Sequence, residues 1–147
     1  MGFHGKDLRS GRHSITGQIY LVTAVTHQRE SLFTQWSASC AVARAIHQVA
    51  QPNLLAWVLM PDHLHCLVQL DNGSLSDFMQ RLKSITAISL NKTLGRTSKV
   101  WQSGFHDHAL RRDEDLKAAA RYLVANPVRA GLVRSVRNYP FWNAVWL

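Results

Sequence analysis

Apolar and polar side chains follow two different periods along the first third of the chain, and each period predicts one kind of element. Residues 18–26 (QIYLVTAVT) are rich in β-branched and aromatic side chains, which is typical of a strand. Residues 34–50 carry apolar side chains at spacings of three and four, which predicts an amphipathic helix. The expected apolar face of this helix consists of Trp36, Cys40, Ala43, Ile46, Val49 and Ala50.

A β-hairpin and a long helix are predicted next. Residues 54–60 (LLAWVLM) form a continuous apolar run of the kind found in buried strands, and residues 63–70 (HLHCLVQL) form the strand that follows. Pro61-Asp62 between them is a turn signal. A helix is expected over residues 75–94, because Ser74 and Asp77 are a typical capping pair before it and Gly95 is a typical stop after it.

The remaining chain predicts one more strand and one more helix. Residues 100–110 favour a short or bent strand. Three acidic residues at 113–115 suit the positive N-terminal end of a helix over residues 116–126. Pro127 limits that helix, because the residue before a proline is biased away from helical geometry. Trp142 and Trp146 in the tail are expected to pack on the core.

The order strand, helix, strand, strand, helix, strand predicts an α+β fold with a ferredoxin-like, split β-α-β antiparallel sheet. An added C-terminal helix carries Tyr122. We expect residues 1–147 to form one domain, with residues 1–17 as a basic arm and residues 136–147 as a tail. Helices on one face of the sheet leave its other face or its edges open to a ligand.

Charge changes this picture, because 17 Lys and Arg residues face only nine Asp and Glu residues. The net charge of +8 and the isoelectric point near 10.2 favour a polyanionic partner, and nucleic acid is the commonest one. Cys40 and Cys66 lie in apolar runs and predict neither a disulfide framework nor a zinc cage. Without a signal peptide or an apolar run of membrane-spanning length, a cytoplasmic protein is expected.

His63 and His65 are the first residues with a chemical signal. Alternate side chains of a strand share a face, so both imidazoles can bind one metal ion while Leu64 points into the core. The alternative is two solvent-facing histidines on a strand, since a His-x-His sequence alone is a weak signal.

Tyr122 and Asn126 are the second signal. They stand four residues apart on the last predicted helix, so they share a face. A phenol oxygen is a usable nucleophile on phosphorus, and a bound metal ion offsets the charge that develops there. A hard ion held by two imidazoles also needs oxygen ligands, which Asn126 can supply. The alternatives are a structural tyrosine and an asparagine that only caps the helix before Pro127.

Four runs together resemble one family. Residues 57–68 (WVLMPDHLHCLV) resemble the His-hydrophobic-His motif of single-tyrosine HUH transposases, and residues 121–133 (RYLVANPVRAGLV) resemble their tyrosine helix. Residues 100–111 (VWQSGFHDHALR) also look like this family. Gly11, Arg12, His13 and Ser14 are similar to the GRHS motif of its REP-associated tyrosine transposase branch. The resemblance covers about residues 10–135, and the ordered set of motifs is far more specific than any one of them.

The resemblance implies a bacterial, nucleoid-associated enzyme that cuts and rejoins single-stranded DNA. It implies that His63 and His65 bind Mg or Mn and that Tyr122 forms a 5′-phosphotyrosine, leaving a free 3′-hydroxyl. It also implies that a polar residue of the tyrosine helix, here Asn126, completes the metal site. The DNA that it implies is a REP-type hairpin with a 5′ single-stranded guide, which the GRHS residues 11–14 would help to read. A monomer is expected for this branch.

Several further residues have two possible interpretations. Four basic residues around one helix could bind the phosphates of a DNA backbone, although each one alone is a typical solvated surface charge: Lys83, Lys92, Arg96 and Lys99. His106 and His108 form a second His-x-His, for which plain strand positions are the favoured interpretation. Trp57 and Trp101 can stack on bases, but core packing is the favoured role. Two rival functions remain: a metal hydrolase that activates water, and a hairpin-binding module without nicking activity.

Overall fold

The structure, a computed structural model, describes residues 17–50, 53–111 and 116–146. The strands are β1 (Ile19–Val25), β2 (Leu54–Met60), β3 (His63–Gln69), β4 (His106–Ala109) and β5 (Trp142–Ala144). The α-helices are α2 (Trp36–Ala50), α3 (Leu75–Leu94), α4 (Leu116–Val124) and α5 (Asn126–Arg129). Short 3-10 helices are η1 (His27–Arg29), η2 (Leu32–Thr34) and η3 (Val136–Asn138). None of the helices described is both long and apolar enough to cross a membrane.

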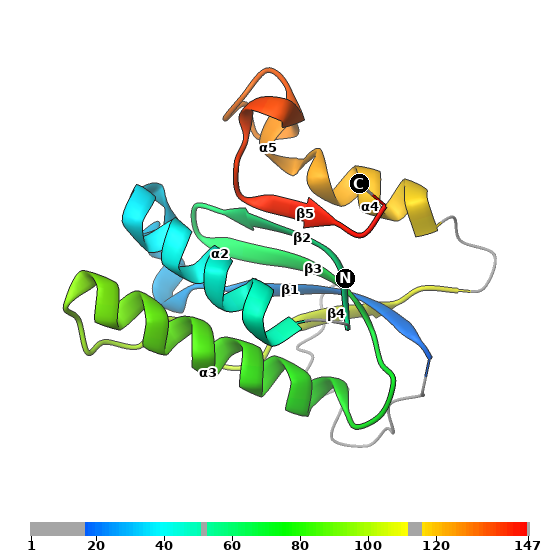
Figure 1. Cartoon of the computed structure of the whole chain (residues 1–147), viewed down its shortest axis with the longest axis horizontal. Helices are drawn as coiled ribbons and strands as arrows, with labels where there is room; N and C mark the ends of the chain where they lie inside the picture. Colours follow the sequence, from blue (N-terminus) through cyan, green and yellow to red (C-terminus); the bar gives the residue numbers. More distant parts are fainter. Residues whose placement is uncertain (1–16, 51–52, 112–115, 147) are drawn as a thin grey trace.

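The strands form one antiparallel sheet in the order β4-β1-β3-β2-β5. Helix α2 connects β1 to β2, and α3 connects β3 to β4, so the first four strands have the predicted ferredoxin-like order (Figure 1). The fifth strand is a finding that the pattern did not predict. It has three residues, too few to show an alternation, and it pairs with the free edge of β2.

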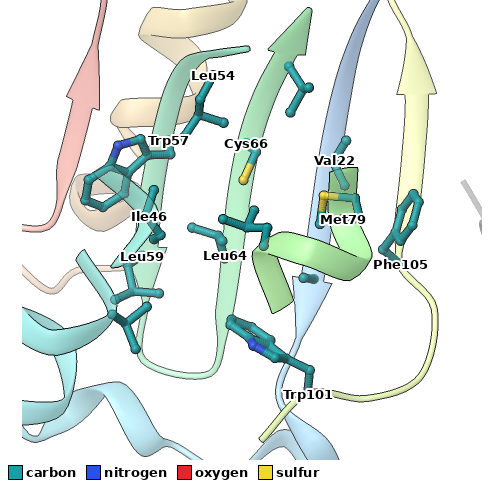
Figure 2. Packing of buried hydrophobic residues seen from close by; sticks show 14 of the residues in the cluster. Val22, Ile46, Leu54, Trp57, Leu59, Leu64, Cys66, Met79, Trp101 and Phe105 are labelled. Carbon is teal, nitrogen blue, oxygen red and sulfur yellow. The ribbon is translucent and has the colours of Figure 1, made fainter. Parts of the chain in front are cut away.

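Helices α2 and α3 pack side by side on one face of the sheet (Figure 1). The apolar layer between them and the sheet includes Leu64 and Cys66 of β3, as Figure 2 shows. Leu64 is therefore in the core, as predicted. Trp57 and Trp101 are also buried there, and the Trp101 indole N–H donates to the Thr86 hydroxyl at 2.9 Å.

The opposite face of the sheet is covered in part by α4, which corrects the expectation of helices on one face only. Helix α4 packs on β2, β3 and β5, and Ala120 and Leu123 are its buried side chains there. They meet Val58 of β2 and Leu67 of β3. The side chains that alternate with Leu64 along β3 therefore face the helix that carries Tyr122.

The predicted apolar face of α2 is wrong at its first position. Trp36 is 66% exposed and its ring contacts Phe141, with 5.1 Å between centroids. The face that is buried consists of Ala38, Ala41, Val42, Ala45 and Ile46. Small alanines allow α2 to pack closely against its neighbour α3, and a count of large apolar residues misses them. The predicted core packing of Trp146 is likewise wrong, because this residue is 38% exposed, whereas Trp142 is half-buried.

The predicted boundaries hold better for α3 than for the elements after it. The Ser74 side chain accepts from the Asp77 N–H, and Gly95 ends the helix with a φ of +63°. Strand β4 is shorter than the predicted residues 100–110, because Trp101 makes only an isolated bridge to Thr26 before the chain turns.

The last predicted helix divides in two, which corrects its extent. Helix α4 ends at Val124, and Asn126 begins α5. Pro127 explains the break, since it has no N–H to donate to the Leu123 carbonyl and its ring clashes with that turn. The Asn126 amide nitrogen donates to the Leu123 carbonyl instead, at 2.8 Å.

Candidate functional site

His63 and His65 lie at the start of β3, directly after the β2–β3 turn. Both side chains point to the face opposite Leu64, as the strand period predicts. Their ring centroids are 4.6 Å apart, and the two Nε2 atoms are 3.0 Å apart. The sequence therefore brings two imidazole nitrogens to one point on the sheet surface.

The other ring nitrogen of each histidine is held by an oxygen. His63 Nδ1 donates to the Asp62 carboxylate at 2.7 Å. His65 Nδ1 lies 2.9 Å from Thr23 Oγ1, on the β1 residue that pairs with it across the sheet. Oxygen partners at Nδ1 fix the orientation of a histidine ring and leave Nε2 available as a ligand, which is the usual arrangement around metal-binding histidines.

The pKa values of His65 and Asp62 are both lowered by their surroundings. Burial lowers the pKa of His65 to about 4, helped by the positive charges of His63 and Arg129. His65 is therefore neutral at pH 7, with its lone pair available. Partial burial of Asp62 acts to raise its pKa, but the hydrogen bonds and charges of His63 and Arg29 outweigh burial and lower it. Asp62 thus remains a carboxylate acceptor for His63.

Tyr122 projects from α4 with 65% of its surface exposed, so it is not a core tyrosine. The Arg129 guanidinium of α5 lies over the Tyr122 ring, 3.7 Å from its centroid. Arg129 also acts electrostatically on His65. The tyrosine, the arginine and the paired histidines therefore belong to the same side of the sheet.

Asn126 is half-buried at the junction of α4 and α5. Its amide nitrogen caps the Leu123 carbonyl, while its side-chain oxygen accepts no hydrogen bond from the described residues. The predicted premise that Tyr122 and Asn126 share one continuous helix is wrong, because the helix breaks between them. Across the described ranges, no three His, Cys, Asp or Glu side chains form a group that could hold a metal ion.

The basic residues expected to bind DNA occupy different environments. The Lys83 ammonium donates to the backbone carbonyls of Gln102 and Gly104. Arg96 is mostly buried and pairs with Glu30 at 3.5 Å, with its Nη1 atom lacking a partner in the described chain. Lys92 is exposed, and Lys99 donates to Ser103 at 3.0 Å. The predicted GRHS residues, Gly11, Arg12, His13 and Ser14, lie outside the described residues.

His106 and His108 lie on β4, on the same face of the sheet as the paired histidines. Thr23 of β1 pairs with His106 on one side and with His65 on the other, and directly paired residues share a face. His106 is half-buried and His108 is exposed.

Three residues of the site were missed by reasoning from the sequence. Asp62 was interpreted only as a turn residue, although its position next to His63 was visible. Thr23 carries the one clear signal, because it is a hydroxyl on the alternating face of an otherwise apolar strand. Arg129 carries no such signal, since it depends on how α5 folds back after Pro127.

Known proteins are similar to this chain in sequence and in fold. The profile of the family described as "Transposase IS200 like" matches residues 14–126. The REP-associated tyrosine transposase of Escherichia coli K12 is 30% identical over 132 residues, which cover 88% of this chain and 78% of that protein. A solved REP-associated tyrosine transposase bound to a REP hairpin superposes with a TM-score of 0.68 at 27% identity, covering 89% of this chain and 79% of that one. A crystal structure from Deinococcus radiodurans, at 19% identity and a TM-score of 0.50 over 79% of this chain and 95% of its own, shares the fold.

The fold and the matched profile define the class, which is that of the IS200-like transposases. Within that class, the chain belongs to the family of REP-associated tyrosine transposases. Membership of this transposase family indicates a DNA-processing enzyme.

Proposed function

We propose that this protein is a metal-dependent endonuclease and strand transferase that cuts and rejoins single-stranded DNA through a covalent bond to Tyr122. The observation that carries the proposal is an exposed phenol on the helix that packs against the sheet face where two imidazoles converge. Arg129 contacts the Tyr122 ring and its charge acts on His65, which supports the proposal that the nucleophile and the paired histidines belong to one site. Phosphodiester transfer needs these two parts: a nucleophile and a means to offset charge on the phosphate.

The residues present fit a divalent ion such as Mg or Mn. Two nitrogens bound at about 2.1 Å in adjacent positions of an octahedral ion lie about 3.0 Å apart, and the two Nε2 atoms have this separation. His63 and His65 would thus hold the ion, and the Asn126 side-chain oxygen would be the third protein ligand. When bound, the ion withdraws negative charge from the phosphate oxygens.

The chain's own residues then account for the bond changes. The Tyr122 oxygen forms a bond to phosphorus, and the bond from phosphorus to the 3′ oxygen breaks. The phenol loses its proton and the leaving 3′ oxygen gains one, so the products are a 5′-phosphotyrosine and a 3′-hydroxyl. A 3′-hydroxyl that attacks the phosphotyrosine reverses the reaction and rejoins DNA without a nucleotide cofactor. The Arg129 guanidinium lies over the Tyr122 ring, so it places a positive charge beside the phenol.

The proposed substrate is a DNA hairpin with a 5′ single-stranded guide. The related solved structure is bound to a REP hairpin, and the net charge of +8 suits a polyanion. Gly11, Arg12, His13 and Ser14 are proposed to read the guide, and the exposed Lys92 and Lys99 to contact phosphates. Arg96 and Lys83 contribute mainly to the fold through their contacts with Glu30 and the backbone. A monomer is proposed, because one chain supplies both the tyrosine and the histidines.

Covalent capture tests this proposal. The protein is incubated with hairpin DNA and Mn and then run on a denaturing gel, where a covalent adduct migrates more slowly than free protein. Tyr122→Phe removes one oxygen from an exposed ring, so folding and DNA binding are expected to persist while adduct and cleavage are lost. Tyr139→Phe is the matched control. Its hydroxyl is already committed to the Leu59 carbonyl, so adduct formation is expected to persist.

The rival functions predict other results. A hydrolase that activates water cleaves without an adduct and continues to cleave as Tyr122→Phe. A module that only binds hairpins shows neither cleavage nor adduct in the unaltered protein. Either result would overturn the tyrosine mechanism.

A further inference from the structure

A groove of about 300 Å³ lies between α4 and the C-terminal strand, on a different side of α4 from the Tyr122 side chain. Its walls include Lys117, Arg121 and Val124 from α4 and Trp142 and Trp146 from the end of the chain. Figure 1 shows β5 running beside α4 at this edge of the sheet. The volume lies at the lower end of the range of small-ligand sites, which is about 300–1,000 Å³.

Two indole rings give the groove an aromatic wall. Trp142 is half-buried, and its indole N–H donates to the Val136 carbonyl at 3.2 Å, which fixes the ring. Trp146 is 38% exposed and lines the groove without being in the core. A large aromatic side chain that remains exposed beside a groove is a typical stacking platform for a flat ligand.

Two cations stand on the opposite wall. Lys117 and Arg121 are four residues apart on α4, so they project from one face of the helix, and both are exposed. No acidic side chain is present among the described residues that line the groove. An aromatic platform flanked by cations suits a nucleotide, whose base stacks and whose phosphates carry negative charge.

The groove also lies within reach of the proposed cleavage site. Arg121 directly precedes Tyr122, and successive residues of a helix project about 100° apart with a rise of about 1.5 Å. A DNA strand that is held at Tyr122 can therefore cross α4 and reach the groove within a few nucleotides.

We propose that this groove binds one unpaired nucleobase of the DNA strand, with the base stacked on Trp146 and the adjoining phosphates near Lys117 and Arg121. The inference rests on the proposed function only in that the ligand is single-stranded DNA. It adds a base-binding subsite on the far side of the tyrosine helix.

Binding of two simple probes tests the subsite. One probe is a 5′-labelled oligothymidylate, and the other is an abasic phosphodiester chain of equal length, so that the two differ only in their bases. Fluorescence anisotropy at low salt gives the ratio of their affinities. The unaltered protein is expected to prefer the oligothymidylate. Trp146→Ala is expected to reduce that preference roughly tenfold, which is about 1.4 kcal/mol and within the range for one stacked base.

Matched variants separate stacking from a loss of structure. Trp36→Ala removes another exposed tryptophan, on α2, and is expected to retain the preference. Trp146→Phe keeps an aromatic face and is expected to retain most of it. Arg121→Ala is expected to weaken both probes equally, because it removes a phosphate contact and no base contact. Unfolding midpoints from circular dichroism identify any variant whose effect comes from misfolding, and the Phe variant then decides.

Three results would overturn the subsite: equal affinity of the unaltered protein for both probes, an unchanged preference in Trp146→Ala, or an equal loss of preference in Trp36→Ala. Sedimentation of the unaltered protein and of Trp146→Ala adds a fourth, since a dimer that depends on Trp146 would assign the groove to a second copy of the chain. The covalent adduct at Tyr122 is measured separately. Adduct formation with no base preference refutes only the subsite, and base preference with no adduct refutes only the tyrosine mechanism.

Discussion

The position of His65 depends on residues from three separate parts of the chain. Thr23 of β1 holds its Nδ1 atom, His63 lies against its Nε2 atom, and the charge of Arg129 from α5 acts on it. Burial makes the neutral form the stable one at pH 7. A neutral imidazole whose ring is held in place in this way is suited to bind a cation.

Thr23→Val tests this arrangement at the scale of one residue. Valine has the shape of threonine but no hydroxyl, so His65 keeps its packing and loses the partner of its Nδ1 atom. Loss of such an outer partner typically lowers metal affinity about 10–100-fold. We expect Mn affinity, measured by isothermal titration calorimetry, to fall by this amount, and cleavage to recover when Mn is raised.

Thr34→Val provides the control for that experiment. Thr34 is exposed in η2, and its hydroxyl donates to the Ser31 carbonyl at 2.9 Å, away from the histidines. Its replacement is expected to leave Mn affinity unchanged. If Thr23→Val also leaves Mn affinity unchanged, Thr23 does not position the ligand.

At the scale of elements, local patterns predicted what local physics decides. The strand period placed His63 and His65 on one face, and the capping pair at Ser74 placed the start of α3. Tertiary contacts decided the rest. The buried face of α2 is set by how this helix packs against α3 and the sheet, and β5 forms only because the edge of β2 is available. The apolar periodicity of each segment alone therefore predicts neither the buried face of α2 nor the formation of β5.

The break between α4 and α5 gives Asn126 two competing duties, and two substitutions separate them. Asn126→Ala removes both the oxygen and the amide donor, so Mn affinity and cleavage are expected to fall. The lost hydrogen bond to Leu123 is also expected to lower the free energy of unfolding by about 1 kcal/mol. Asn126→Asp keeps an oxygen ligand and loses the donor, so it is expected to retain Mn binding with reduced stability.

Calorimetry with Mn measures the role of Asn126 as a metal ligand. Urea denaturation without Mn measures its role as a helix cap. If Asn126 only caps the helix end, both substitutions lower stability and neither changes Mn affinity. That outcome would remove Asn126 from the metal site and leave His63 and His65 as the ligands.

At the scale of the whole molecule, the larger part of the core and the candidate site lie on opposite faces of the sheet. One face is closed by α2 and α3 and holds most of the core, while the other carries the histidines and only part of it is covered by α4. The sequence predicted the order of the elements and the two histidines, because short-range spacing determines both. It could not predict Arg129 or the groove beside Trp146, because these depend on how the chain after Pro127 returns to the sheet edge.

The uneven charge of the molecule leads to the last prediction, which concerns how it binds DNA. With a net charge of +8, affinity for any DNA is expected to fall steeply with salt, because each neutralised phosphate releases condensed counterions. Lys92 is exposed near the end of α3, so Lys92→Ala is expected to weaken all DNAs alike and to reduce the slope of log affinity against log salt by about one. Arg12→Ala is expected to act differently, by relaxing discrimination between hairpins that differ only in their guide. Anisotropy titrations with matched and mismatched guides over a range of NaCl measure both effects, and an equal loss on every guide for Arg12→Ala would refute its reading role.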